Sequence, residues 1–295
     1  MRKLSNSKKI LILSVTKRCN LRCLYCRPNN NETYDKISFL SDTIDFAKAD
    51  FNKIKNIWLK NQITEILLTG GEPLEYPYIL DLLEFFYDNK ITFSIHTNGL
   101  SFKWQKVLAF LKNKKLSPKI LLSIELVKKL QKQLRGSNIP LELIKKLNDL
   151  NCKIELKINL HKQLVKYLPS FAKILKFWLE QGIYSIRFQP IIPIGSKNFI
   201  QTISLDKSCI ELFAQLIYLK NTKYKKFILN STKNLYLPIF IIQNKVILND
   251  TILQCCAYQR IILMNTNGEL LDCFKLFTKK ACITDFDLKC CCFYP

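Results

Sequence analysis

The sequence has no apolar run that approaches the roughly 18 residues needed to cross a membrane. Its longest apolar runs cover Ile10 to Val15 and Ile239 to Ile242. The first run follows a basic start, as in a signal peptide, but it has only about six apolar residues and no small-residue cleavage site follows it. We therefore expect no membrane segment, interpret residues 10–15 as a buried strand, and predict a cytoplasmic protein.

Arginine and acidic residues are also scarce. The chain of 295 residues has 46 Lys and Arg against 23 Asp and Glu, a formal charge of +23, yet only seven of the basic residues are Arg. Nucleic-acid recognition favours clustered Arg side chains, whereas these lysines are scattered along the whole sequence. We interpret the charge as a solvated lysine surface and expect no nucleic-acid partner, with RNA binding as the alternative.

Glycine is rare, and each of the seven lies at the end of an expected strand, in a turn or at a segment boundary. Such positions need a positive φ or a close approach of the backbone that other residues replace poorly. They are Gly70, Gly71, Gly99, Gly136, Gly182, Gly195 and Gly268. We expect functional residues near several of them.

Short apolar runs alternate with segments of helical period between residues 10 and 190. The expected strands cover residues 10–15, 63–68, 91–96, 119–124, 153–160 and 184–190. The expected helices include residues 79–87, 104–111, 141–150 and 171–179, where apolar residues recur three or four positions apart. This alternation predicts an α/β fold with a parallel sheet, either open or a partial barrel, that binds ligands at the carboxyl ends of its strands.

The alternation stops after Pro190. Hydrophobic residues make up 48% of the sequence, which excludes a disordered chain and is enough for one large domain or two modest ones. We predict a core at residues 1–190 and a linker with one helix at residues 191–235. A small module of two β-hairpins is expected at residues 236–295, the second hairpin turning at Asn267-Gly268.

Twelve cysteines form two groups, which indicates two metal sites rather than the disulfide framework of a short secreted protein. The early group is Cys19, Cys23 and Cys26. The late group is Cys255, Cys256, Cys273, Cys282, Cys290, Cys291 and Cys292. Cys152 and Cys209 stand alone, and we interpret both as ordinary core residues.

The early cysteines stand in TKRCNLRCLYCRP, directly after the first expected strand. Three thiolates at spacings of four and three can hold a 4Fe-4S cluster and leave one iron without a protein ligand. The alternatives are a chance triple or a zinc site, which would need a fourth Cys or His nearby. Neither alternative explains why the triple follows a strand.

Together with LLTGGEP one βα unit later, this pattern resembles the radical S-adenosylmethionine (SAM) superfamily, whose signature is CxxxCxxC after the first strand. The resemblance implies a partial (β/α)6 TIM-like barrel and an enzyme that binds a 4Fe-4S cluster through Cys19, Cys23 and Cys26. It implies reductive cleavage of SAM, followed by abstraction of hydrogen from a substrate.

The same resemblance implies a set of SAM contacts. These are Tyr25 near the adenine, Gly70, Gly71 and Glu72 at the methionine amino group, Ser123 at the ribose or the methionine carboxylate, and Arg135 at the SAM carboxylate. A surface helix cap is the alternative for the LRGS string around Arg135. Glu125 departs from the family, in which a Ser-x-Asp string is common at residues 123–125.

The late cysteines resemble the start of the SPASM or twitch module of radical SAM maturases. The resemblance implies an auxiliary 4Fe-4S cluster bound by Cys256, Cys273 and one or two of the other late cysteines, among which we choose Cys291. The alternatives are Cys255, Cys282, Cys290 and Cys292, and the run of cysteines is shorter than in a complete SPASM module. Four thiolates on hairpins describe a structural zinc site equally well.

We therefore predict an enzyme that modifies a peptide or protein side chain. The expected partners are a reductase such as flavodoxin or ferredoxin and a separate peptide-recognition protein. The alternatives are an RNA- or small-molecule-modifying radical SAM enzyme and a non-catalytic iron–sulfur protein.

Overall fold

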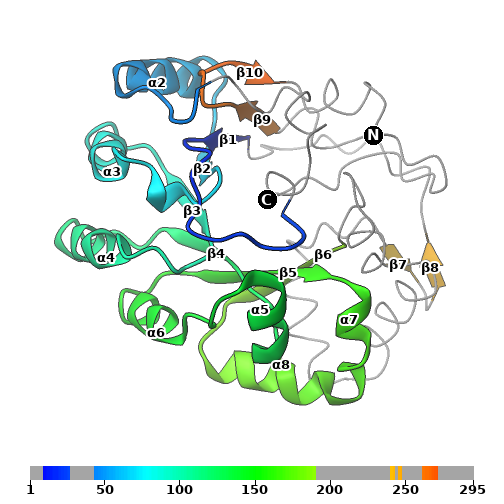
Figure 1. Cartoon of the computed structure of the whole chain (residues 1–295). Helices are drawn as coiled ribbons and strands as arrows, with labels where there is room; N and C mark the ends of the chain where they lie inside the picture. The colour runs from blue at the N-terminus through cyan, green and yellow to red at the C-terminus, as the bar shows by residue number, and fades with distance from the viewer. Residues whose placement is uncertain (1–8, 27–42, 191–239, 243–244, 248–260, 272–295) are drawn as a thin grey trace.

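A computed structural model describes residues 9–26, 43–190, 240–242, 245–247 and 261–271 (Figure 1). Its main feature is an eight-stranded sheet in the order β10-β9-β1-β2-β3-β4-β5-β6. The strands of the predicted core are β1 (Ile10–Ser14), β2 (Glu65–Thr69), β3 (Phe93–Thr97), β4 (Lys119–Ser123), β5 (Ile154–Leu160) and β6 (Ser185–Pro190). These six strands are parallel to their neighbours, and the sheet is curved but not closed. The predicted partial barrel is therefore confirmed.

Helices connect the parallel strands. They are α2 (Phe51–Lys60), α3 (Ile79–Asp88), α4 (Trp104–Asn113), α5 (Lys128–Arg135), α6 (Leu141–Asp149), α7 (Lys162–Val165) and α8 (Phe171–Glu180). Short 3-10 turns lie at Lys48–Asp50, Pro73–Glu75 and Leu168–Ser170. In Figure 1, α2, α3, α4 and α6 form a row along the outer face of the curved sheet.

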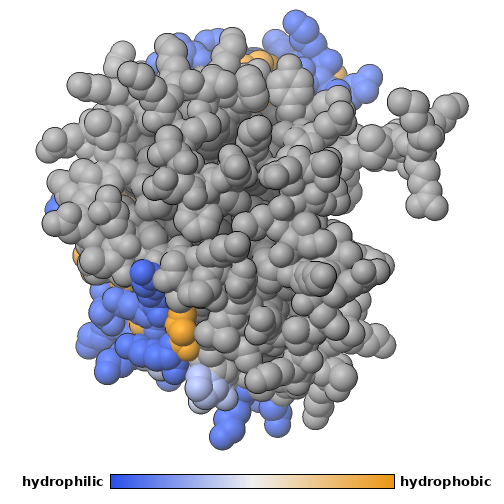
Figure 2. Space-filling view, turned by 90° about the vertical axis from the view of Figure 1, so that its right-hand side faces the viewer, coloured by the Kyte–Doolittle hydropathy of each residue, from blue (hydrophilic) through white to orange (hydrophobic). Residues whose placement is uncertain are grey.

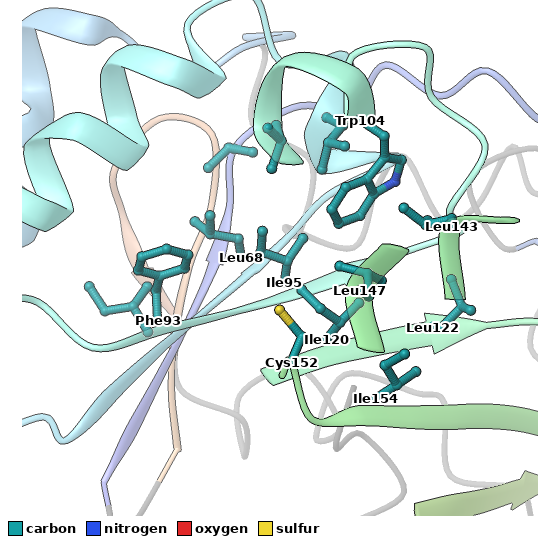
Figure 3. Close-up of a cluster of buried hydrophobic side chains, with 14 of the residues drawn as sticks. Leu68, Phe93, Ile95, Trp104, Ile120, Leu122, Leu143, Leu147, Cys152 and Ile154 are labelled. Carbon is teal, nitrogen blue, oxygen red and sulfur yellow. The ribbon is translucent and has the colours of Figure 1, made fainter. Parts of the chain in front are cut away.

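The hydrophobic core lies between that row of helices and the sheet. Helix α4 buries Trp104, Val107 and Leu111, whose spacing places them on one face of a helix. Figure 3 shows Trp104 of α4 and Leu147 of α6 in one cluster with strand residues that include Ile95 and Ile120. Cys152 belongs to the same core, as its isolation in the sequence predicted. Because alternate strand residues face this layer, the carboxyl ends of the strands are held in fixed positions.

The second predicted hairpin is present, and it joins the core sheet. Strand β9 (Ile261–Met264) pairs in parallel with β1, and β10 (Leu270–Leu271) pairs antiparallel with β9. The turn between them contains Gly268 at a φ of +75°, a left-handed conformation that suits glycine. The residues predicted as a separate late module therefore add a strand beside β1, a pairing that the sequence did not indicate.

The first predicted hairpin consists of β7 (Phe240–Ile242) and β8 (Lys245–Ile247), paired antiparallel. The linker and its predicted helix lie outside the described residues. Within the described ranges, no helix is long and apolar enough to span a membrane. On the face drawn in Figure 2, most of the described residues at the surface are hydrophilic, with small hydrophobic areas among them.

Candidate active site

The three early cysteines lie on one loop, residues 15–26, which we call the cysteine loop. It follows β1 at the carboxyl edge of the sheet and is drawn in dark blue in Figure 1. Cys19 is exposed, Cys23 and Cys26 are partly buried, and none of the three is in a disulfide in the described part of the chain. The backbone N–H of Cys26 donates to the carbonyl of Cys23 at 3.0 Å, so a turn brings these two residues together.

The first half of the cysteine loop is fixed by residues 44–46. Thr16 is buried, and its Oγ1 donates to Oδ1 of Asp45 at 2.6 Å. The Nε of Arg18 lies 3.0 Å from Oδ2 of Asp45. Backbone hydrogen bonds from Lys17 and Phe46 add to this contact. Asp45 was not identified from the sequence, because nothing near it marks a contact with a loop 29 positions away.

Gly70 and Gly71 allow the cysteine loop to pass directly against the end of β2. A Cβ atom on Gly70 would lie 2.3 Å from the carbonyl oxygen of Thr16, and one on Gly71 would lie 2.2 Å from that of Arg18. The N–H of Gly71 donates to the carbonyl of Thr16 at 2.7 Å, and that of Glu72 donates to Arg18 at the same distance. The two glycines are therefore required by backbone contact with the cysteine loop.

Glu72 joins the ends of β2 and β3. Its Oε1 accepts from Oγ1 of Thr97 at 2.7 Å and from the N–H of Leu74 at 3.3 Å, and its Oε2 accepts from the N–H of Asn98 at 2.7 Å. The side chain is buried, and this burial raises the pKa of the carboxyl to about 7, against the lowering effect of its hydrogen bonds.

Asn98 connects β3 to the cysteine loop, a role that the sequence did not reveal. Its Nδ2 donates to Oδ1 of Asn20 at 2.8 Å and lies 3.9 Å from Sγ of Cys19. The available signal was its place in the HTNG string after a predicted strand. Nothing in that string indicates which residues Asn98 contacts.

Tyr25 and Arg135 meet at Glu125. The hydroxyl of Tyr25 donates to Oε1 of Glu125, and Nε of Arg135 lies 3.3 Å from the same oxygen. The guanidinium carbon of Arg135 is 5.4 Å from the centre of the Tyr25 ring. His161, which sequence analysis missed, places Nε2 3.1 Å from Oε2 of Glu125. The only sequence signal was its position directly after β5 in a chain with two histidines.

Ser123 ends β4, one strand away from His96 on β3. The Oγ of Ser123 lies 2.7 Å from Nε2 of His96. The predicted late ligands Cys256, Cys273 and Cys291 lie outside the described residues.

The donor set of the cysteine loop fits an iron–sulfur cluster. Partial burial raises the pKa of the Cys23 thiol, and the nearby Arg135 opposes this effect. A thiol of raised pKa is mostly protonated near neutral pH, and the binding of a metal displaces its proton. No three Cys, His, Asp or Glu side chains in the described ranges are grouped as ligands of a single metal ion. Three cysteines on one loop that hydrogen bonds hold against the sheet suit a cluster, in which each cysteine binds a different iron.

Comparison with known families gives the same result. The model of the radical SAM superfamily matches residues 13–162, about half of the chain, and includes the cysteine loop and strands β2 to β5. The chain belongs to the radical SAM superfamily. Members of this family are enzymes that work with SAM and a 4Fe-4S cluster.

Individual relatives match this chain either in part of its sequence or in its fold. GTP 3',8-cyclase from Aquifex aeolicus is 38% identical over 72 residues, which are 24% of this chain and 21% of that protein. SuiB from Streptococcus suis, in its SAM-bound structure, has a TM-score of 0.61 at 19% identity and covers 93% of this chain. The chain spans 62% of the length of SuiB.

A second similar structure is that of anSMEcpe with bound AdoMet. It has a TM-score of 0.62 at 15% identity and covers 91% of this chain and 72% of the other. At such identities the structural matches to SuiB and anSMEcpe show the fold alone.

Proposed function

We propose that this radical SAM enzyme binds its 4Fe-4S cluster through Cys19, Cys23 and Cys26. The observation that supports the proposal best is the bracing of the cysteine loop against the ends of β2 and β3, through Gly71, Glu72 and Asn98. When bound, the cluster supplies the electron that breaks a C–S bond of SAM, which leaves a radical able to take hydrogen from a substrate.

The residues proposed to contact SAM lie around the cysteine loop. Gly70, Gly71 and Glu72 would receive the methionine amino group at the end of β2, where backbone oxygens and a carboxylate suit an ammonium. Tyr25 and Arg135 would lie at the adenine and the carboxylate. Ser123, at the end of β4, would form a hydrogen bond with the ribose or the carboxylate of SAM.

We infer that the substrate is a peptide or protein side chain, so that the chain belongs with the SPASM or twitch maturases. SuiB bound to the precursor peptide SuiA has a TM-score of 0.59 and covers 96% of this chain, which favours this class. The same proposal includes an auxiliary 4Fe-4S cluster, held by Cys256, Cys273 and Cys291. A flavodoxin or ferredoxin would supply the electron, and a separate protein would recognise the peptide.

A small-molecule substrate is the second candidate, because the cyclases matched by sequence are named for GTP. Deuterium transfer separates the two. A substrate deuterated at the reacting carbon passes deuterium to 5'-deoxyadenosine, so candidate peptides and GTP can be compared in one assay. Transfer from GTP, with none from any peptide, would reject the peptide proposal.

Cluster binding itself is tested by iron analysis of anaerobically reconstituted protein. We expect loss of about four irons per chain in Cys23→Ala. The matched control is Cys152→Ala, which removes a thiol buried in the hydrophobic core and should keep the iron. Equal iron in both variants would contradict the proposed ligand set.

A further inference from the structure

Glu125 is completely buried, and both of its carboxylate oxygens are occupied by side chains of the protein. Oε1 accepts from the Tyr25 hydroxyl and from Nε of Arg135, and Oε2 faces Nε2 of His161. Both Glu125 and His161 are 0% exposed. A ribose hydroxyl could reach this carboxylate only by displacing one of these partners.

The partners of Glu125 come from separate parts of the fold. Tyr25 lies on the cysteine loop, Arg135 ends α5, and His161 directly follows β5. The N–H of Glu125 donates to Oε1 of Gln131 on α5 at 2.8 Å, which fixes the backbone that carries the carboxylate. Glu125 therefore ties the second half of the cysteine loop to two elements of the barrel.

The burial of two opposite charges explains why the contact between Glu125 and Arg135 is strong. A buried carboxylate and a buried guanidinium are each costly without a partner, and removing one leaves the other uncompensated. Arg135 is 6% exposed and forms an ion pair with Glu125. The guanidinium carbon of Arg135 is also 5.4 Å from the centre of the Tyr25 ring, so Arg135 contacts both the carboxylate and the cysteine loop.

We propose that Glu125 is a positioning residue that holds Tyr25 and Arg135 in the places from which they bind SAM, without contacting SAM itself. Its effect on SAM rests on the proposed function, whereas its contacts within the protein do not. The longer carboxylate, which departs from the Ser-x-Asp string of the family, reaches the Tyr25 hydroxyl and the Arg135 guanidinium instead of a ligand.

The first test compares Glu125→Gln with Glu155→Gln. Glu155 is an equally buried glutamate, 1% exposed, with Nζ of Lys119 at 2.7 Å. It lies near the start of β5, roughly 20 Å from His161 at the usual rise of a strand. In the full chain with its cluster reconstituted, we expect the Kd for SAM to rise at least tenfold in Glu125→Gln. In Glu155→Gln it should stay within twofold of wild type. An unchanged Kd in Glu125→Gln overturns the proposal.

A double-mutant cycle with Tyr25→Phe shows whether Glu125 acts through Tyr25. This substitution keeps the ring and removes only the hydroxyl that reaches Glu125. We expect Tyr25→Phe to raise the Kd for SAM several-fold in the native background and to have little further effect in Glu125→Gln. Effects that multiply independently would overturn the proposal, as would an unchanged Kd in Tyr25→Phe alone. If Glu125→Gln does not fold, the Kd for SAM of Tyr25→Phe decides whether the proposal holds.

Urea unfolding of the cluster-free protein separates this inference from the proposed function. If wild-type protein with a loaded cluster does not bind SAM, the proposed function is wrong. The same double-mutant cycle on unfolding then reports whether Tyr25 and Glu125 are coupled. Absence of coupling there would overturn the positioning role independently of SAM.

Discussion

The side-chain amide of Asn98 points its nitrogen at the cysteine loop, 3.9 Å from Sγ of Cys19 and 2.8 Å from Oδ1 of Asn20. Its orientation is fixed, because its Oδ1 accepts from the N–H of Leu100 at 2.8 Å and its backbone N–H donates to Glu72. A donor directed at a ligand sulfur favours the reduced form of an iron–sulfur cluster. Asn98 is therefore placed to influence the cluster as well as the loop.

Replacing Asn98 by Ala should lower the reduction potential of the cluster. The loss of one hydrogen bond is worth about 1 kcal/mol, or roughly 40 mV for a one-electron couple. Redox titration followed by electron paramagnetic resonance measures the shift. Asn148→Ala is the control, since that side chain lies on α6 and donates to the carbonyl of Gln181. A potential that does not move in Asn98→Ala would show that the amide does not reach the cluster.

Glu72 should make the stability of the cluster-free protein depend on pH. Burial raises its pKa from 4.5 to about 7, so between these values the folded state binds a proton more tightly than the unfolded state. The contribution of Glu72 to the free energy of unfolding is therefore complete below pH 4.5, falls as the pH rises, and is lost above about pH 7. The loss amounts to about 3 kcal/mol.

Urea unfolding at a series of pH values measures this dependence. In Glu72→Gln the fall between pH 4.5 and 7 should largely disappear, because the group no longer titrates. Glu155→Gln, which removes another buried carboxylate, should keep it. The same slope in Glu72→Gln as in wild type would assign the titration to another residue.

The strands and helices of the core follow from local patterns. Apolar runs such as residues 10–15 and 153–160 became β1 and β5, because alternation with helical segments is a property of neighbouring residues. Helix α5 was not predicted as a helix. It carries three lysines and one arginine among eight residues, which leave few apolar positions to show a period.

Contacts between distant residues could not be predicted in this way. Strand β9 pairs with β1 across most of the chain, and nothing in either strand specifies the other. His161 meets Glu125 from 36 positions away. The sequence marked Glu125 only as a departure from the Ser-x-Asp string, and nothing in it connected Glu125 with His161. The cysteine spacing was informative because three thiols of one site lie within eight residues, from Cys19 to Cys26.

Gly71→Ala should displace the cysteine loop. The added Cβ would lie 2.2 Å from the backbone oxygen of Arg18, which belongs to a loop held on its other side by Asp45. We expect a loss of about 1–3 kcal/mol in unfolding free energy, as for other overpacked sites, together with reduced iron binding.

Gly136→Ala is the matched control for that substitution. Gly136 has a φ of +66°, and an added Cβ would meet nothing within 4 Å. It should lose about 1 kcal/mol through backbone strain alone and keep its iron. Equal iron loss in both variants would mean that the contact between Gly71 and the loop is not what shapes the site.

The most direct test of radical SAM chemistry at the cysteine loop is the formation of 5'-deoxyadenosine. Anaerobically reconstituted protein is incubated with SAM and dithionite, beside Cys23→Ala and the core control Cys152→Ala. The account predicts 5'-deoxyadenosine from the wild type and from Cys152→Ala, and none above background from Cys23→Ala. Wild-type protein with a loaded cluster that makes none would contradict the proposed chemistry and favour a non-catalytic iron–sulfur protein.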